Sequence, residues 1–273
     1  MNAAVPMARS DFFRVEHIMG MPILIDVRDS DIDPAALDRA FDWLRWVDAI
    51  FSTYRSDSEI SRLNRGELAL IDAHPDVREV LSLCDRFREE TGGYFDIRAP
   101  AVTLEGRADS AAHCSDSVDP SGLVKGWSVG RAAEILDAAG ARNYSINAGG
   151  DIIARGRPAP DPYWRLGIQH PLLRDQLAGV VAITDQAIAT SGASERGNHI
   201  IDPHTGLPPS DVLSVTIVGP DLTTADAYAT AAYAMGKAGP AWTARLVGYE
   251  AMTILADQTV LSTMGFPSIE EGF

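Results

Sequence analysis

Short strand-forming segments separated by glycine and proline turns fill the second half of the sequence, and they constrain the fold more than any other feature. They cover residues 144–147, 151–156, 164–169, 177–184 and 212–218. Short turns join antiparallel neighbours, because a parallel pair needs a crossover of a dozen or more residues. The sequence therefore predicts sheets that are mostly antiparallel.

Amphipathic helical segments accompany these strands. The clearest covers residues 34–51, where Phe41, Leu44 and Val47 recur at helical spacing behind a proline in the first turn. Further helices are predicted near residues 75–91, 128–139, 224–235 and 240–247, and further strands near 21–27 and 251–256. Because helices and strands do not alternate in a regular βαβ rhythm, the predicted class is α+β.

The composition is that of an ordinary folded protein. The 273 residues are 46% hydrophobic and 22% charged, without internal repeats or low-complexity linkers. We expect a single domain over residues 1–273, as one unit or two closely packed lobes, with residues 1–16 as an N-terminal extension. The net charge of −15 opposes binding to nucleic acids and anionic membranes. A small anionic ligand would need a local cation or a helix N-terminus.

Cysteine spacing and apolar runs indicate the cellular location to expect for the protein. Cys84 and Cys114 are the two cysteines, and they show neither a disulfide framework nor the spacing of a zinc site. No apolar run reaches the length of a signal peptide core or a membrane span. We therefore expect a cytoplasmic protein without a membrane span.

Asp226 and Thr230 form the first candidate site. Their spacing of four residues places a carboxylate and a hydroxyl on one face of the predicted 224–235 helix, where both oxygens can bind one hard cation such as Mg²⁺. The alternative is structural: Thr223 or Thr224 caps the helix and Asp226 complements its dipole.

A second candidate lies in the NHIIDPHTG run. Asp202 to Gly206 are predicted to form a turn, with His199 delivered to its edge by a short extended segment. A neutral imidazole there can accept a proton from an attacking hydroxyl, with Asp202 to orient it. His199 and His204 can equally be structural hydrogen-bonding residues of the turn.

Two further motifs offer contacts for a ligand. In INAGGDI, the two glycines either let a ligand approach the backbone or simply form a hairpin turn. The Asp119 to Gly126 segment is predicted to be a loop before a helix, so that its amides face an anion while Lys125 reaches a phosphate, or else is merely solvated. Tyr54, in a polar turn, either stacks on a flat ring or covers the core.

The order of these motifs along the chain is more specific than any one of them. It resembles the FAD:protein FMN transferases, the ApbE family, from about Met19 to Gly236. The matching segments are FSTYRSDSEISRLN, TGGYFDIRAP, VDPSGLVKGWSVGRAAEIL, NYSINAGGDIIARG, WRLGIQHP, AIATSGASER, HIIDPHTG and DAYATAAYAMG. The fold that this resemblance implies is an α+β, T-fold-like architecture with antiparallel sheets flanked by helices.

The resemblance implies a reaction and a set of roles. The reaction is Mg²⁺-dependent transfer of the FMN half of FAD to a threonine or serine of an acceptor protein, with release of AMP; Mn²⁺ is the alternative metal. Asp226, Thr230 and the backbone of Gly122 match metal ligands, and His199 matches the base for the accepting hydroxyl. Residues at positions resembling the family's FAD contacts are Met19, Tyr54, Tyr94, Phe95, Asp96, Asp119, Lys125 and His199.

Departures from the family pattern leave two other functions open. Residues 98–118 differ from the usual family sequence, Gly130 stands where an aspartate is common, and no lipoprotein leader is seen. One alternative is a protein that binds or stores FAD without transferring FMN. The other is an FAD pyrophosphatase, in which water replaces the acceptor hydroxyl and gives FMN and AMP.

Overall fold

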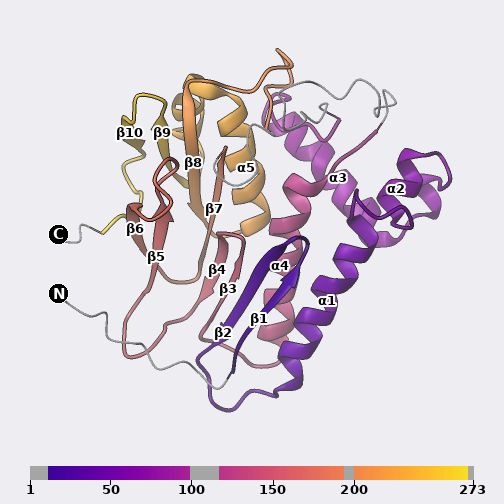
Figure 1. Ribbon diagram of the computed structural model, residues 1–273. Helices are drawn as coiled ribbons and strands as arrows, with labels where there is room; N and C mark the ends of the chain where they lie inside the picture. The colour runs from indigo at the N-terminus through magenta and orange to yellow at the C-terminus, as the bar shows by residue number, and fades with distance from the viewer. Residues whose placement is uncertain (1–11, 99–116, 194–199, 270–273) are drawn as a thin grey trace.

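An eight-stranded antiparallel sheet forms the centre of the protein (Figure 1). The computed structural model describes residues 12–98, 117–193 and 200–269. In spatial order the strands are β1 (Phe12–Ile18), β2 (Met21–Val27), β3 (Tyr144–Ala148), β4 (Asp151–Arg155), β7 (Gln186–Gly192), β8 (Val212–Gly219), β9 (Glu250–Leu255) and β10 (Val260–Ser262). Every neighbouring pair is antiparallel, which confirms the predicted α+β class.

Helices gather on one face of this sheet (Figure 1). The longer ones are α1 (Ala35–Phe51), α3 (Pro75–Glu90), α4 (Ser121–Ala138) and α5 (Leu222–Ala234). Short ones are α2 (Glu59–Asn64), α6 (Gly239–Thr243) and the 3-10 turns Leu70–Asp72 and Gly236–Ala238. The helical periodicity of α1 is confirmed, because Phe41, Leu44 and Val47 are fully buried. No helix in the described ranges is long and apolar enough to cross a membrane.

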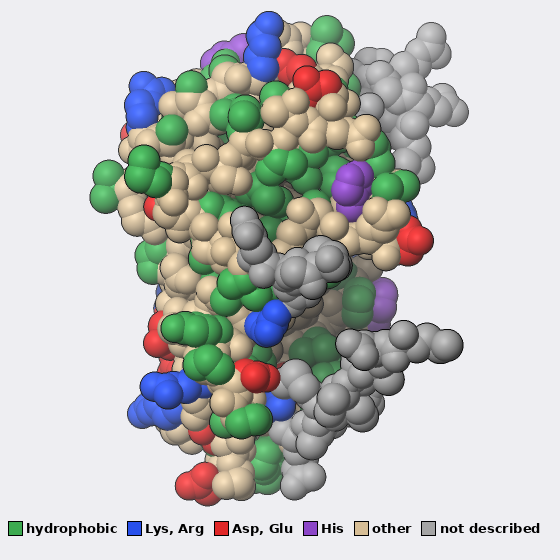
Figure 2. Space-filling view, turned by 90° about the vertical axis from the view of Figure 1, so that its left-hand side faces the viewer, with side chains coloured by type: hydrophobic (Ala, Val, Ile, Leu, Met, Phe, Trp, Pro, Cys, Tyr) green, Lys and Arg blue, Asp and Glu red, His purple; other side chains and the backbone are tan. Residues whose placement is uncertain are grey.

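The opposite face of the large sheet is covered by a second, two-stranded sheet. Its strands β5 (Trp164–Gln169) and β6 (Leu177–Ile183) form an antiparallel hairpin. Trp164 and Ile183 pack there against Ile188 and Val218 of the large sheet. The view from this side, Figure 2, shows acidic and basic side chains interspersed among hydrophobic ones. The net negative charge is therefore not gathered into one acidic patch on this face.

Close packing of α4 against α5 depends on Gly126. A β-carbon built at this position would lie 2.8 Å from the Leu222 carbonyl oxygen and 3.0 Å from the Asp226 β-carbon. Real side chains do not approach so closely, so only glycine allows the two helices this separation. The position therefore brings Asp226 against the backbone of α4.

Several elements depart from the sequence expectations. Helix α4 begins at Ser121, where a loop up to Gly126 was expected, because its two glycines conceal the helical periodicity. Just before the helix, Asp119 Oδ1 accepts from the Ser121 amide at 3.0 Å. Strands β1, β7 and β10 and helix α2 were not predicted. Strand β1 places residues 12–16, expected to be an extension, in the large sheet, paired with β2.

Candidate functional site

The three predicted metal ligands come together where α4 meets α5. Asp226 and Thr230 lie one turn apart on α5, as their spacing predicts. A β-carbon built on Gly122, in the first turn of α4, would lie 4.0 Å from Thr230 Oγ1. Two segments about a hundred residues apart in the sequence thus bring a carboxylate, a hydroxyl and the Gly122 backbone to one helix junction.

Asp226 is buried, with 4% of its surface exposed. Its Oδ2 accepts a hydrogen bond from the Gly126 amide at 3.0 Å. In an α-helix the N–H of residue i donates to the carbonyl of residue i−4, so this amide is also the natural donor to the Gly122 carbonyl. Asp226 therefore contacts α4 one helical turn after Gly122, the third predicted ligand.

The helix cap bears on one part of the structural interpretation of Asp226. The N-cap of α5 is Asp221, whose Oδ1 accepts from the Thr224 amide at 2.8 Å and from the Thr224 hydroxyl at 2.6 Å. Capping by Thr223 or Thr224 is therefore not observed. Asp226, buried on the α4 side, belongs to the helix junction and not to the cap.

Strand β7 supplies one hydroxyl group next to this junction, because Ser191 Oγ lies 3.3 Å from Thr230 Oγ1. The neighbouring Thr190 points to the other face of the sheet, where its Oγ1 lies 2.9 Å from Thr216 Oγ1 of β8. The Thr190 amide donates to Asp151 Oδ1 at 3.1 Å. Hard oxygen atoms of this kind are the ligands that Mg²⁺ prefers, and they fit such an ion. Within the described ranges, no group of three His, Cys, Asp or Glu side chains gathers at one point.

Lys125 completes the polar side of the site. Its Nζ lies 2.6 Å from Asp151 Oδ2, and Asp151 is 1% exposed at the start of β4. The GGD motif is a hairpin turn: Gly149 and Gly150, with φ of 57° and 94°, connect β3 to β4. The turn thus places Asp151 next to α4, a helix that precedes it in the sequence.

The predicted flavin contacts near the end of α3 differ in exposure. Tyr94 is half-buried and meets the ring of His204 edge-on, with centroids 4.6 Å apart. Phe95 is 2% exposed and packs in the helical core, so its side chain is closed to a bulky ring. Asp96 pairs with Arg88 at 2.8 Å.

The other predicted flavin contacts lie on turns. Met19 adopts a left-handed φ of 53° beside Gly20 at the β1–β2 turn, and its side chain packs against the core. Asp119 Oδ1 accepts a hydrogen bond from the Ser121 amide at the start of α4. Tyr54 is 98% exposed, so it does not cover the core and its ring is open to a ligand.

The turn after the predicted base is well defined. His199 lies outside the described residues. Asp202 Oδ1 accepts from the His204 amide at 2.9 Å, and Oδ2 accepts from Thr205 Oγ1 at 3.1 Å, so this carboxylate shapes the turn. His204 Nε2 lies 3.1 Å from the Gly92 carbonyl oxygen and joins the turn to the end of α3.

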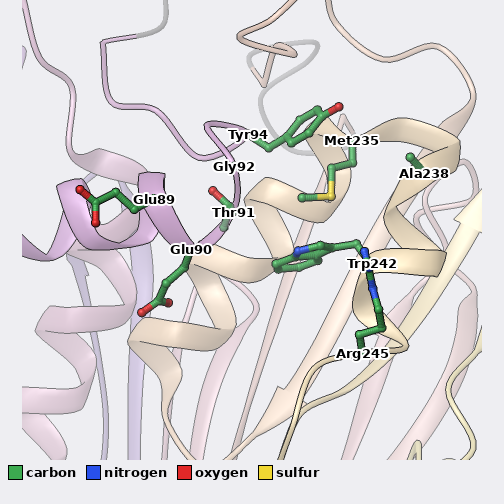
Figure 3. Close-up of a pocket in the computed structure, with 9 residues that line it drawn as sticks. All are labelled: Glu89, Glu90, Thr91, Gly92, Tyr94, Met235, Ala238, Trp242 and Arg245. Carbon is green, nitrogen blue, oxygen red and sulfur yellow. The ribbon is translucent and has the colours of Figure 1, made fainter.

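A shallow hollow of about 420 Å³ lies next to this turn, between the end of α3 and α6 (Figure 3). Figure 3 shows Met235 and Trp242 between Tyr94 and Glu90. Burial, together with the Glu90 carboxylate that accepts its hydrogen bond at 3.2 Å, raises the pKa of nearby Tyr228 to about 12, so this phenol keeps its proton at neutral pH. Tyr94 is the predicted flavin contact that lines the hollow, whereas Gly122, Asp226 and Thr230 are not among its lining residues.

Sequence reasoning missed Gly126, Thr190, Ser191 and the partner of Lys125. Gly126 was predicted to be in a loop, and Ser191 was read as part of a motif without a strand assignment. Asp151 was noted only as a polar group near the glycines. A buried ion pair between α4 and β4 leaves no signal in the spacing of residues along the chain.

Fold and site together define an α+β protein with an oxygen-rich centre at the junction of two helices and a sheet. The sequence model of the ApbE family matches residues 19–115 and 104–253. The chain therefore belongs to the ApbE family, and it is a transferase.

Relatives and solved structures agree with this assignment. FAD:protein FMN transferases of Haemophilus influenzae and Vibrio cholerae are 28% and 29% identical over 71% and 77% of this chain, and over 70% and 75% of their own lengths. The solved flavin transferase ApbE from Vibrio cholerae superposes with a TM-score of 0.79 at 25% identity, covering 94% of this chain and 98% of that one. The ApbE protein of Thermotoga maritima, at 23% identity, shares the fold with a TM-score of 0.78 over 93% of this chain and 97% of its own.

Proposed function

We propose that this protein transfers the FMN part of FAD to a threonine or serine hydroxyl of an acceptor protein and releases AMP in a Mg²⁺-dependent reaction. The names of its relatives support FAD and a protein as the two substrates. The observation that carries the proposal is the convergence of Gly122, Asp226 and Thr230 at the α4–α5 junction.

The three groups at the junction would hold Mg²⁺ through a carboxylate, a hydroxyl and a carbonyl oxygen. A bound divalent cation neutralises charge on pyrophosphate oxygens, which a protein of net charge −15 otherwise repels. Gly126 orients Asp226 through its amide, and Ser191 contacts Thr230. Both contacts keep the predicted ligands in place before the substrate arrives.

The bond changes define what the other residues must do. The acceptor hydroxyl oxygen forms a bond to the FMN phosphorus, and the bond from that phosphorus to the bridging oxygen breaks, so AMP leaves with the bridging oxygen. The hydroxyl proton passes to a base, for which we propose His199. Asp202 keeps the shape of the turn that follows this histidine.

Binding of FAD is assigned to the surrounding turns. Lys125 is proposed to donate to a phosphate, and the exposed ring of Tyr54 and the half-buried ring of Tyr94 to contact the flat parts of FAD. Met19, Asp96 and Asp119 are proposed to contact FAD from the β1–β2 turn and the two ends of the 97–118 segment. The buried Phe95 contributes through its backbone.

Incubation of the protein with FAD, Mg²⁺ and candidate acceptor domains tests the proposal. Mass spectrometry should show an FMN adduct on an acceptor threonine or serine, with one AMP released for each adduct, and chelation of the metal should stop both. FAD bound in equal amount without AMP would instead indicate a storage protein. FMN and AMP formed without an acceptor would indicate a pyrophosphatase.

A further inference from the structure

Asp151 is a buried carboxylate that the proposed reaction does not use directly. It is 1% exposed, and both of its oxygens have specific contacts. Oδ2 lies 2.6 Å from the ammonium of Lys125, and Oδ1 accepts from the Thr190 amide at 3.1 Å. A carboxylate removed from water is costly unless a cation and hydrogen-bond donors compensate it, so the Lys125 ammonium and the Thr190 amide both stabilise this buried side chain.

The two partners of the ion pair differ in their access to solvent. The Lys125 side chain is 21% exposed, whereas that of Asp151 is 1% exposed. Lys125 follows Gly122 by three residues on α4, so both lie on the same side of that helix. An ammonium carries three N–H donors in a tetrahedral arrangement, so one that a carboxylate holds can also donate to a ligand. In this ion pair the carboxylate is therefore buried, and the ammonium remains accessible to a ligand.

Asp151 also forms a hydrogen bond with the neighbouring strand β7. Its bond to the Thr190 amide lies beyond the paired residues Ile152 and Ile188 of β4 and β7. The next residue, Ser191, contacts Thr230 of the predicted metal site. One carboxylate therefore links the cation on α4 with the strand that supports α5.

We propose that Asp151 is a positioning residue that holds the Lys125 ammonium where it binds the phosphates of a dinucleotide. The inference rests on the proposed function, because it takes FAD as the ligand. Asp151 itself does not touch the ligand, and it acts through Lys125. A charge-assisted hydrogen bond to phosphate is strong only if the donor is held in the correct direction.

The test compares Asp151→Asn, Lys125→Met and the double variant in steady-state transfer assays. Asp151→Asn keeps the side-chain shape and an oxygen for Thr190, but removes the negative charge. We expect it to raise KM for FAD about tenfold with kcat changed by less than about twofold, and we expect the same of Lys125→Met. The double variant should have the KM of Lys125→Met alone, because the carboxylate acts through the lysine.

Asp29→Asn is the matched control. Asp29 is also a hydrogen-bonded aspartate, but its partners Arg142 and Asn143 follow the C-terminal end of α4, whereas Lys125 lies near the N-terminal end of that helix. It should leave KM for FAD unchanged. If Asp151→Asn is too unstable to purify, the comparison uses the double variant, in which neither charge remains, against Lys125→Met, with the same expected equality of KM.

Riboflavin separates a phosphate contact from general damage to the site. Fluorescence titration should show weaker binding of FAD to Asp151→Asn but equal binding of riboflavin, which has no phosphate. An unchanged KM for FAD, or an additive effect in the double variant, overturns the role of Asp151. Absence of both FAD binding and transfer in the unmodified protein would overturn the proposed function instead.

Discussion

Thr230 shows how one hydroxyl group can be tested at the residue scale. It lies one turn after Asp226 and 3.3 Å from Ser191 Oγ, at the place where Gly122 approaches α5. Thr230→Val keeps the branched shape and removes the oxygen. We expect transfer to fall at least about tenfold and the Mg²⁺ concentration for half-maximal rate to rise, as initial rates against Mg²⁺ concentration will show.

Thr223→Val is the control for this change, because Thr223 also faces α4 but lies two helical turns before Thr230 on the same helix. It should keep the rate within about twofold, and the melting temperatures of both variants separate loss of folding from loss of metal binding. Equal rates in the two valine variants would contradict a role of Thr230 in metal binding.

Residue positions in the site were partly predictable from the sequence. The spacing of Asp226 and Thr230 placed both on one helix face, and the structure has them there. The ion pair of Lys125 with Asp151 was not predictable, because nothing local relates a helix to the strand that follows the GGD turn. Phe95 was assigned a flavin contact, yet its side chain is in the core, since a motif match does not say which way a side chain points.

Two glycines of α4 provide a matched pair at the element scale. A β-carbon at Gly126 would meet the Leu222 carbonyl oxygen at 2.8 Å, whereas one at Gly130 would meet Thr223 Oγ1 at 3.8 Å, an ordinary contact. Gly126→Ala should lower the free energy of unfolding by about 1–3 kcal/mol through overpacking. Gly130→Ala should raise it by up to about 1 kcal/mol, because alanine favours the helix.

Urea unfolding of the two alanine variants measures this difference. Gly126→Ala should also raise the Mg²⁺ requirement, since the change pushes against Asp226. Equal stability of the two variants would show that α4 and α5 separate without cost. The same glycines explain why the sequence predicted a loop from Asp119 to Gly126: their low helix propensity conceals a helix that tertiary packing stabilises.

At the scale of the whole molecule, Asp29 ties together loops that are over a hundred residues apart. Its Oδ2 accepts from the amides of Arg142 and Asn143 at 2.7 and 2.8 Å, and its Oδ1 accepts from Asn143 Nδ2 at 2.7 Å. Partial burial opposes the charged form, but these hydrogen bonds outweigh it and lower the pKa of Asp29 below its ordinary 3.8.

The lowered pKa of Asp29 determines how its contribution to stability changes with pH. The contribution of Asp29 to the free energy of unfolding is fully present above pH 3.8 and is lost as the pH falls through the lower pKa of the folded state. Asp29→Asn should therefore be less stable than the unchanged protein near neutral pH, and the difference should shrink in acid. Urea unfolding from pH 7 down to pH 2.5 would contradict this if the difference stayed constant.

The centre of the fold was predicted from the sequence more fully than the edge strands of the large sheet. Short turns between strands predicted antiparallel pairing, and the periodicity of residues 34–51 predicted α1. The edge strands β1 and β10 were missed because they bury little: Val15, Val260 and Leu261 are 49%, 52% and 40% exposed, so their apolar residues give no clear alternation. Strand β7 was missed because its small and hydroxyl residues resemble those of a turn.

The bond between the Gly126 amide and Asp226 closes a loop of one hundred residues. A ribosome adds about 5–20 residues each second, so the α4 half of the site emerges roughly 5–20 seconds before the α5 half. During that interval a growing chain carries Gly122 and Lys125 but neither Asp226 nor Thr230. A nascent chain is therefore unable to assemble the proposed metal site, and any activity that depends on it begins only after nearly all of the sequence has been made.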